Sequence, residues 1–390
     1  MVCTFYFCHQ KSTTVADNFQ IRDVFNERVV DLLANRIAAA YPDFRADTFR
    51  QYIVSELATL TYSERLEHIT DAYEQFLPDD FATTVPILLD SLLPPYGSDE
   101  LDSSYDRFIA VTKANYVARH GLPHFDLSMR ALYEITQCMT SEWGIRPFLL
   151  NYPDRTLKKL DEWTTDPNPH VRRLVSEGSR PHLPWGKKLP LFEREPQRTL
   201  ALLEKLKKDP SEYVRRSVAN HLNDLTKKHP DLVVDTLGRW QAAGQSIDEQ
   251  RMLKHALRTL LKKGHPGALA LLGYTADVPV SIQNFHVSNS VALGKQLLFA
   301  FDLQHTAEQP QALMIDYVVY FRKANGQLAP KVFKLTTREL SPNTVELIEK
   351  KHSFKVISTR KYYAGTHRLA IQVNGVERAE KTFELLENGQ

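Results

Sequence analysis

Two matched helical segments carry the charged side chains that could do chemistry. DPNPHVRRLVSEG, which begins at Asp166, matches DPSEYVRRSVANH, which begins at Asp209, at an offset of 43 residues. Each segment holds an Arg-Arg pair at the same place: Arg172 and Arg173 in the first, Arg215 and Arg216 in the second. Because the pairs recur one unit apart, they predict a row of cations that suits a phosphate backbone.

Acidic residues fall on the same side of these helices as the second arginine of each pair. If Val171, Leu174 and Val175 form the buried stripe of the first helix, residue 177 points about 120° away from it. Glu177, and likewise Asp224 on the second helix, are therefore predicted on an exposed face. The plain alternative is that these charges only pair along the helix surface, where each pair contributes about 0.2–0.5 kcal/mol.

The segment after Glu177, GSRPHLPW, breaks the helix where the matched helix continues. Gly178, Pro181 and Pro184 are incompatible with a regular helix. A repeat that departs from its own pattern at one place is a candidate functional site.

Helices are the elements that must position these residues. Apolar spacing predicts helices at 21–37, 49–60, 63–76, 81–93, 105–119 and 127–138, with a loop at 94–104. The 43-residue repeat, with a looser third unit at 250–265, is typical of HEAT-type units, which stack into a solenoid with a concave face.

Alternating apolar residues begin near residue 276 and predict short strands at 280–287, 296–303, 314–321, 331–335, 344–349, 368–373 and 381–386. YAGTHRL, from Tyr363, resembles the corner of an immunoglobulin-like domain, with His367 in place of the usual tyrosine and Leu369 in place of the disulfide cysteine. The predicted fold is an all-α HEAT-like helical solenoid followed by an all-β immunoglobulin-like sandwich. Its predicted parts are an irregular N-terminus (1–18), a helical domain (19–275) and the sandwich (276–390).

The charge is unevenly distributed along the chain. Residues 1–150 carry a net charge of −9, residues 151–270 carry +8 and residues 271–390 carry +3. A basic segment in a near-neutral protein indicates a polyanionic partner, although a solvated Lys-rich surface explains it equally well.

Cysteine usage and hydropathy indicate a reduced, cytoplasmic protein. The three cysteines, Cys3, Cys8 and Cys138, form no CxxC pair, and no apolar run is long enough to span a bilayer. His120 and His124 have HxxxH spacing, but Gly121 and Pro123 break the helix that such a metal site needs. We expect no metal and no cofactor.

Three stretches together carry a resemblance to a known family. SEGSRPHLPW from Ser176, TSEWGIRPF from Thr140 and NHLND from Asn220 resemble motifs of the HEAT-like alkylpurine DNA glycosylases, in particular of the AlkC type. The resemblance covers roughly residues 20–275, and one branch of AlkC proteins also carries an immunoglobulin-like domain.

The resemblance implies hydrolysis of the N-glycosidic bond of a cationic alkylated base in double-stranded DNA. The base would be 3-methyladenine, with 3-methylcytosine as a second candidate. Carried over by motif, the catalytic carboxylates would be Glu142, Glu177 and Asp224, which stabilise a cationic sugar and orient water. For Glu142 the alternative is an ordinary helix-surface residue. Trp185 would contact the lesion, or else pack in the core; Trp143 and Trp163 are assigned to the core.

The predicted phosphate-binding cations are Arg172, Arg173, Arg180, Arg215, Arg216, Lys187, Lys254 and Arg258, the last three of which could be plain surface. The family's open concave face also implies excision without a deep cavity for a flipped base. The sandwich either touches DNA or is only a stabilising appendage, and we expect a monomer. The competing hypothesis is a non-catalytic HEAT-repeat module that binds DNA or protein.

Overall fold

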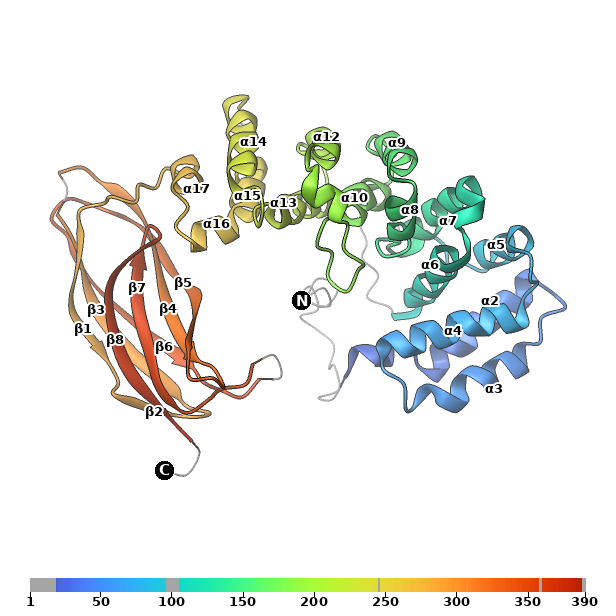
Figure 1. The fold of residues 1–390 in the computed structure, drawn as a ribbon, viewed down its shortest axis with the longest axis horizontal. Coiled ribbons are helices and arrows are strands. Elements are labelled where there is room, and N and C mark those ends of the chain that lie inside the picture. The colour runs from blue at the N-terminus through green and yellow to red at the C-terminus, as the bar shows by residue number, and fades with distance from the viewer. Residues whose placement is uncertain (1–18, 96–104, 245, 307, 358–359, 388–390) are drawn as a thin grey trace. The chain divides into compact units, whose positions relative to one another are not determined.

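The computed structural model describes residues 19–95, 105–244, 246–306, 308–357 and 360–387. The predicted irregular N-terminus (1–18) and most of the predicted 94–104 loop lie outside the described residues. A helical part precedes a β-sandwich, which confirms the predicted fold class (Figure 1). By contacts the chain divides into two compact units, residues 1–228 with 246–255 and residues 229–245 with 256–390.

The first unit is helical throughout its described part. Its elements are η1 (Ile21–Val24), α2 (Glu27–Ala40), α3 (Ala46–Leu57), α4 (Tyr62–Phe76), α5 (Phe81–Asp90), η2 (Tyr105–Phe108), α6 (Ile109–His120), η3 (Leu122–His124), α7 (Phe125–Cys138), α8 (Arg146–Asn151), α9 (Pro153–Trp163), α10 (Pro169–Gly178), α11 (Pro190–Arg194), α12 (Gln197–Leu206), α13 (Glu212–Leu225) and all but the last residue of α15 (Ile247–Ala256).

The predicted helix at 21–37 is interrupted. Asn26 caps α2 by accepting a hydrogen bond from the Val29 backbone N–H at 3.1 Å, so a separate 3₁₀ turn precedes the helix. Asparagine favours this cap because its side chain replaces a missing intrahelical acceptor.

The matched repeats are joined by an arginine staple that recurs with the 43-residue period. Arg172 donates to the carbonyls of Asp166 and Pro167, at 2.7 and 3.0 Å, and also binds both carboxylate oxygens of Asp209. Arg215 repeats this pattern on the carbonyls of Asp209 and Pro210 and on the carboxylate of Asp248. Each staple therefore ties the Asp-Pro turn of one helical repeat to an acidic residue of the next repeat.

The second unit contains α14 (Pro230–Ala242), α16 (Arg258–Lys262), α17 (Pro266–Leu271) and the sandwich. Its strands are β1 (Val280–Val287), β2 (Ser290–Ala292), β3 (Gln296–His305), β4 (Gln311–Arg322), β5 (Leu328–Leu340), β6 (Val345–Ser353), β7 (Gly365–Val373) and β8 (Val376–Leu386). They form a three-stranded sheet, β1-β3-β6, and a five-stranded sheet, β2-β8-β7-β4-β5. Seven of these strands were predicted, and the short β2, which pairs parallel to β8, was not. The predicted boundary after residue 275 falls between α17 and β1 and stays a prediction.

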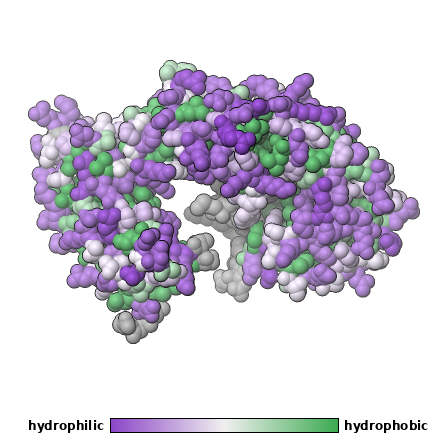
Figure 2. All heavy atoms as spheres, viewed as in Figure 1, coloured by the Kyte–Doolittle hydropathy of each residue, from purple (hydrophilic) through white to green (hydrophobic). Residues whose placement is uncertain are grey.

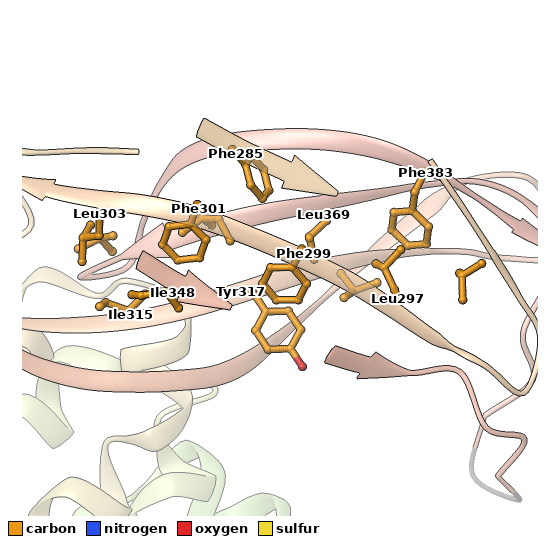
Figure 3. Packing of buried hydrophobic residues seen from close by; sticks show 14 of the residues in the cluster. Phe285, Leu297, Phe299, Phe301, Leu303, Ile315, Tyr317, Ile348, Leu369 and Phe383 are labelled. Atoms are coloured by element: carbon orange, nitrogen blue, oxygen red, sulfur yellow. The ribbon is translucent and has the colours of Figure 1, made fainter. Parts of the chain in front are cut away.

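Aromatic and aliphatic side chains from the two sheets fill the sandwich core (Figure 3). Phe299 of β3 lies against Tyr317 of β4, with ring centroids 5.1 Å apart. His367 is fully buried, and its Nδ1 donates to the Gly365 carbonyl at 2.9 Å, so the histidine makes a local backbone contact at the predicted corner. Leu369 is also fully buried, which replaces a disulfide by apolar packing.

The last helices are fixed to the β7–β8 hairpin. A Cβ built on Gly264 would lie 2.5 Å from the Gly375 carbonyl oxygen, so the two backbones touch without side chains between them. Both glycines have positive φ, 68° and 79°. Asn374 donates to the Thr275 carbonyl at 2.8 Å, close to the same contact. This hairpin therefore explains why α16 and α17 belong to the compact unit of the sandwich.

The face of the molecule drawn in Figure 2 is largely hydrophilic, with apolar residues in scattered groups. In the described part of the chain, no helix has the length and apolarity needed to cross a membrane.

Candidate active site

Three acidic side chains from separate elements of the first unit meet in one buried cluster. Glu142 lies in the turn between α7 and α8, Glu177 in the last turn of α10 and Asp224 in the last turn of α13. Their exposed fractions are 1%, 4% and 6%. Three buried carboxylates need compensating charges or hydrogen bonds, because transfer of an unpaired ion out of water is very costly.

Two arginines supply that compensation and link the acids in a row, here named the carboxylate–arginine chain: Glu142, Arg173, Glu177, Arg180, Asp224. Arg173 pairs with Glu142, and its Nη2 lies 3.5 Å from Oε1 of Glu177. Arg180 places Nη1 at 2.5 Å from the same Glu177 oxygen and Nε at 2.8 Å from Oδ2 of Asp224. Glu177 and Asp224 are thus bridged by one guanidinium group.

The prediction that Glu177 and Asp224 lie on an exposed face is wrong. The helical periodicity correctly turns them away from Val171 and its apolar neighbours, but other segments cover that side of the helices. Gly178 packs so closely on the 140–145 turn that an added Cβ would lie 2.6 Å from Cγ2 of Ile145. Ser217 of α13 covers Glu177 and donates to its Oε2 at 2.6 Å.

The pKa values of Glu142 and Glu177 are shifted in opposite directions. Burial raises the pKa of Glu142, and the nearby Glu177 adds to this, so that Arg173 offsets the increase only in part. Burial would also raise the pKa of Glu177, but Arg173, Arg180 and the Ser217 hydroxyl outweigh it, so the pKa of Glu177 is lowered. Glu177 is therefore held as a carboxylate, whereas Glu142 takes up a proton more readily.

The oxygens of Glu142 and Glu177 also differ in their hydrogen bonding. Both oxygens of Glu177 accept hydrogen bonds, from Arg180 on Oε1 and from Ser217 on Oε2. Glu142 accepts from Arg173 and Thr140 on Oε2, and within the described part of the chain nothing donates to its Oε1. Glu142 consequently keeps one carboxylate oxygen that a water molecule can use.

The irregular loop after α10 is anchored by Arg146, which is 1% exposed. Its Nη1 donates to the carbonyls of Gly178 and Arg180, at 2.8 and 2.9 Å, and its Nε donates to the Lys187 carbonyl at 2.5 Å. Burial lowers the pKa of Arg146 to about 10, with Arg180 as the next cause. Arg146 therefore holds both ends of the loop that carries Arg180.

Trp185, near the end of this loop, is 62% exposed, so the alternative of core packing is wrong. Its backbone has φ +59°, the left-handed region that a residue with a side chain rarely adopts. Trp143 donates from its indole Nε1 to the Pro184 carbonyl at 3.1 Å and so supports the turn beneath Trp185.

A cavity of 410 Å³ lies beside Trp185, and the expected excision without a deep cavity for a flipped base stays a prediction. Tyr62, Trp143 and Trp185 are among its lining residues, and so is Thr140, which is hydrogen-bonded to Glu142. Tyr62 is far away in sequence, on the first turn of α4, so no local pattern could reveal this wall.

The predicted phosphate-binding cations fall into three groups. Arg172 and Arg215 serve as the repeat staples, and Arg173 and Arg180 belong to the carboxylate–arginine chain, so all four guanidinium groups have carboxylate partners inside the protein. Arg216 pairs with Glu212 of the same helix at 3.9 Å and its side chain is 43% exposed, and Lys187 and Lys254 are exposed. Arg258, half-buried, belongs to the second unit. Contact of any of these residues with DNA stays a prediction.

Four residues of the site were missed as functional by sequence reasoning: Tyr62, Trp143, Arg146 and Ser217. Trp143 and Arg146 lie inside the TSEWGIRPF stretch, so the motif that drew attention to Glu142 is the signal that could have found them. Trp143 was assigned to the core and is instead half-buried on the cavity wall, whereas Trp163 is 8% exposed and does lie in the core.

Comparisons with known proteins agree with this architecture. Residues 136–262 match the family model described as a DNA alkylation repair enzyme, and residues 281–387 match the C-terminal Ig-like domain of the uncharacterised protein YhaZ. Protein YhaZ of Bacillus subtilis (strain 168), itself uncharacterised, is 35% identical over 367 residues, which covers 94% of this chain and 99% of that protein.

A solved structure resembles almost the whole chain. It is the alkylpurine DNA glycosylase AlkC of Pseudomonas fluorescens bound to DNA containing an abasic site analog. It matches with a TM-score of 0.85 and 35% sequence identity, over 93% of this chain and 99% of that one. The chain therefore belongs to the AlkC-type alkylpurine DNA glycosylases, a family of DNA alkylation repair proteins, and it combines helical repeats with a C-terminal immunoglobulin-like domain.

Proposed function

We propose that this chain hydrolyses the N-glycosidic bond of cationic alkylated bases in double-stranded DNA, with 3-methyladenine as the main substrate and 3-methylcytosine as a second one. The observation that carries the proposal is the carboxylate–arginine chain, in which three acids from three elements are buried side by side. The relative from Pseudomonas fluorescens, bound to DNA with an abasic site analog, supports DNA as the partner.

The alkylated base is a good leaving group. Alkylation gives the base a positive charge, and the electron pair of the broken C1′–N bond neutralises it as the base departs. The positive charge then moves to the sugar, which resembles an oxocarbenium ion and is stabilised by fixed carboxylates. A cationic base therefore leaves without a general acid. A neutral base would need protonation by one, so neutral lesions are poor substrates.

We assign the three acids different parts in this step. Glu177 and Asp224 stabilise the cationic sugar, and the lowered pKa of Glu177 favours this charge. Glu142 orients the attacking water through its free Oε1 and accepts the water proton, for which its raised pKa is suited. Trp185, exposed at the end of the loop, contacts the damaged nucleotide, and the intact nucleotide is not flipped into an enclosed pocket.

Base release from DNA that contains a single 3-methyladenine tests this proposal. Single-turnover rates of Glu177→Gln and Asp224→Asn should fall roughly a hundred-fold or more, because each substitution removes a charge that stabilises the transition state. Glu204→Gln, an exposed glutamate of α12, is the matched control and should keep the wild-type rate. Wild-type protein that binds this DNA without releasing base would instead identify a non-catalytic DNA-binding module.

A further inference from the structure

We propose that Tyr213 is a positioning residue of the active site, whose ring holds the guanidinium group of Arg173 between Glu142 and Glu177. This inference rests on the proposed function and adds a residue that acts through Arg173. Tyr213 lies half-buried on the first turn of α13. The central carbon of the Arg173 guanidinium group lies 5.1 Å from the centroid of its ring, within the roughly 6 Å at which an aromatic face attracts a cation.

Tyr213 belongs to a stripe of α13 that contacts successive members of the carboxylate–arginine chain. Tyr213, Ser217 and Asp224 are spaced by four and seven residues, so they share one face of the helix. Ser217 donates to Glu177 at 2.6 Å, and Asp224 accepts from Arg180 at 2.8 Å. Tyr213 meets the first arginine of the carboxylate–arginine chain in the same way. The stripe thus supports this row of charges at three points.

Arg173 needs support because its two acidic partners lie on different elements. Its Nη1 pairs with Glu142 and donates to the Thr140 hydroxyl at 2.9 Å, whereas its Nη2 lies 3.5 Å from Glu177. The longer of these contacts is the first to be lost if the guanidinium group turns toward Glu142. A ring that attracts the central carbon opposes this rotation without using any N–H donor. The side chain of Arg173 is 12% exposed, so little water weakens the attraction.

The ring of Tyr213 is itself held by His170, the residue at the same position of the preceding repeat. The two ring centroids lie 5.4 Å apart in an edge contact. Burial lowers the pKa of His170 to about 4, with Arg173 as the next cause, so at neutral pH this histidine is uncharged and does not repel Arg173. One position in two successive repeats therefore provides both the ring and its support.

Loss of the Tyr213 ring should change the ionisation of both glutamates. Arg173 lowers the pKa of Glu142 and of Glu177, so both pKa values rise if it moves away. The other charged and titratable groups that face these two carboxyls are Arg146 of α8, Arg180 of the loop after α10, and His221 and Asp224 of α13. None of these four is held by Tyr213, so the change can be attributed to Arg173.

The test compares Tyr213→Leu with Tyr213→Phe in the full chain, on DNA that contains a single 3-methyladenine. At saturating protein, the single-turnover rate of Tyr213→Leu should fall roughly five- to thirty-fold, as expected for loss of a partly desolvated cation–ring contact. The acid limb of its pH–rate profile should move to higher pH by about half a unit or more. Tyr213→Phe keeps the ring face and should behave as wild type.

Tyr320→Leu is the matched control. It removes a tyrosine ring whose centroid lies 3.6 Å from the Arg368 guanidinium carbon, in the sandwich, and should leave both the rate and the acid limb unchanged. If Tyr213→Leu does not fold, Tyr213→Met gives the same comparison, because its flexible side chain fills the space without a ring.

Two results would overturn the inference: a slower Tyr213→Leu with its acid limb at the wild-type pH, which indicates a merely structural role, or a Tyr213→Phe as impaired as Tyr213→Leu. NMR titration of isotope-labelled glutamate carboxyls gives a readout without catalysis. Wild-type protein that releases no base contradicts the glycosylase proposal, and higher pKa values of Glu142 and Glu177 in Tyr213→Leu would still support the role of Tyr213. Unchanged pKa values in that variant contradict this role alone.

Discussion

Arg180 determines how two of the acids can work. Its guanidinium group donates to Glu177 and Asp224 at once, and it is 7% exposed. Two carboxylates held this close would repel each other without a cation between them, and one of them would take up a proton. Arg180 is therefore a positioning residue rather than a surface cation.

We expect Arg180→Met to move the acid limb of the pH–rate profile to higher pH. Arg180 lowers the pKa of Glu177, so its removal raises that pKa and less Glu177 is ionised at a given pH. The measurement is the single-turnover excision rate between pH 5 and 9, and Arg180→Lys, which keeps the charge, should show a smaller displacement. An acid limb at the wild-type pH in Arg180→Met would show that Glu177 ionisation does not limit the reaction.

His221 makes the stability of the site dependent on pH. It is fully buried, its Nδ1 donates to the Ser176 carbonyl at 3.0 Å, and burial lowers its pKa to about 4. The unfolded chain, with a histidine pKa near 6.5, binds more protons between these two values, so this contribution is lost as pH falls from about 6.5 to 4.

Between pH 7 and pH 5 this histidine alone should reduce the free energy of unfolding by about 2 kcal/mol. Urea denaturation of wild type and His221→Gln at the two pH values measures the effect. The variant should lose about 2 kcal/mol less than wild type over this interval. An equal loss in both proteins would show that His221 does not contribute.

At the scale of elements, the repeat staples and the close contact at Gly178 decide how the helices are spaced. Arg172 and Arg215 each tie one repeat to the next through the same pattern of carbonyl and carboxylate contacts. The Arg172–Asp209 pair is well covered, with side chains 12% and 3% exposed. Removing one partner of such a pair leaves the other charge buried and uncompensated.

Arg172→Met should therefore destabilise the first unit by about 3 kcal/mol. The matched control is Arg130→Met, which removes an arginine 72% exposed from an i,i+4 pair and should cost at most about 0.5 kcal/mol. Chemical denaturation of both variants gives the comparison. Similar losses in the two variants would mean that the staple adds nothing beyond a surface pair.

Gly178→Ala tests the contact that closes the site. The added methyl group would lie 2.6 Å from Ile145, so the 140–145 turn or the end of α10 must move, at about 1–3 kcal/mol. Excision should fall with it because that turn carries Glu142. Gly238→Ala on α14 is the control: its Cβ would meet Leu271 at an ordinary 3.5 Å, so it should be neutral or slightly stabilising. Full activity of Gly178→Ala would show that the turn adapts.

Features that depend on local periodicity could be predicted from the sequence. Features that depend on contacts between segments far apart in the chain could not. Alternating apolar residues located seven strands, and the repeat located the helices of Glu177 and Asp224. The helical wheel also oriented Glu177 correctly relative to Val171. Glu177 is buried because Ser217 and the 140–145 turn cover it, and Tyr62 forms a wall of the cavity. These are contacts between distant segments, which no local sequence pattern contains.

At the scale of the whole molecule, the question is which cations of the basic segment are exposed and can contact DNA. The basic segment, residues 151–270, carries a net charge of +8, but four of its arginines are engaged with carboxylates of the protein itself. The cations that can meet a phosphate are therefore the exposed ones, such as Arg216 and Lys254.

Arg216→Ala and Lys254→Ala should each weaken DNA binding and lower the slope of log K against log salt concentration by about 1. Arg172→Met should leave this slope unchanged, because its guanidinium group is bound within the protein. Affinities measured by fluorescence anisotropy over a series of salt concentrations give the slopes. An unchanged slope for Arg216→Ala would remove it from the DNA-contacting residues.

The alternation of signs along the carboxylate–arginine chain also affects how DNA can approach. Its three negative groups are matched by Arg173, Arg180 and Lys227, whose Nζ lies 3.7 Å from Oδ1 of Asp224, so these six charges sum to zero. Beyond a Debye length, about 8–10 Å at physiological salt, they exert almost no force on an incoming polyanion. Only an atom in direct contact senses the individual acids. The protein can thus carry a strongly anionic point inside a surface that attracts phosphate, and the approaching duplex meets no repulsion from it.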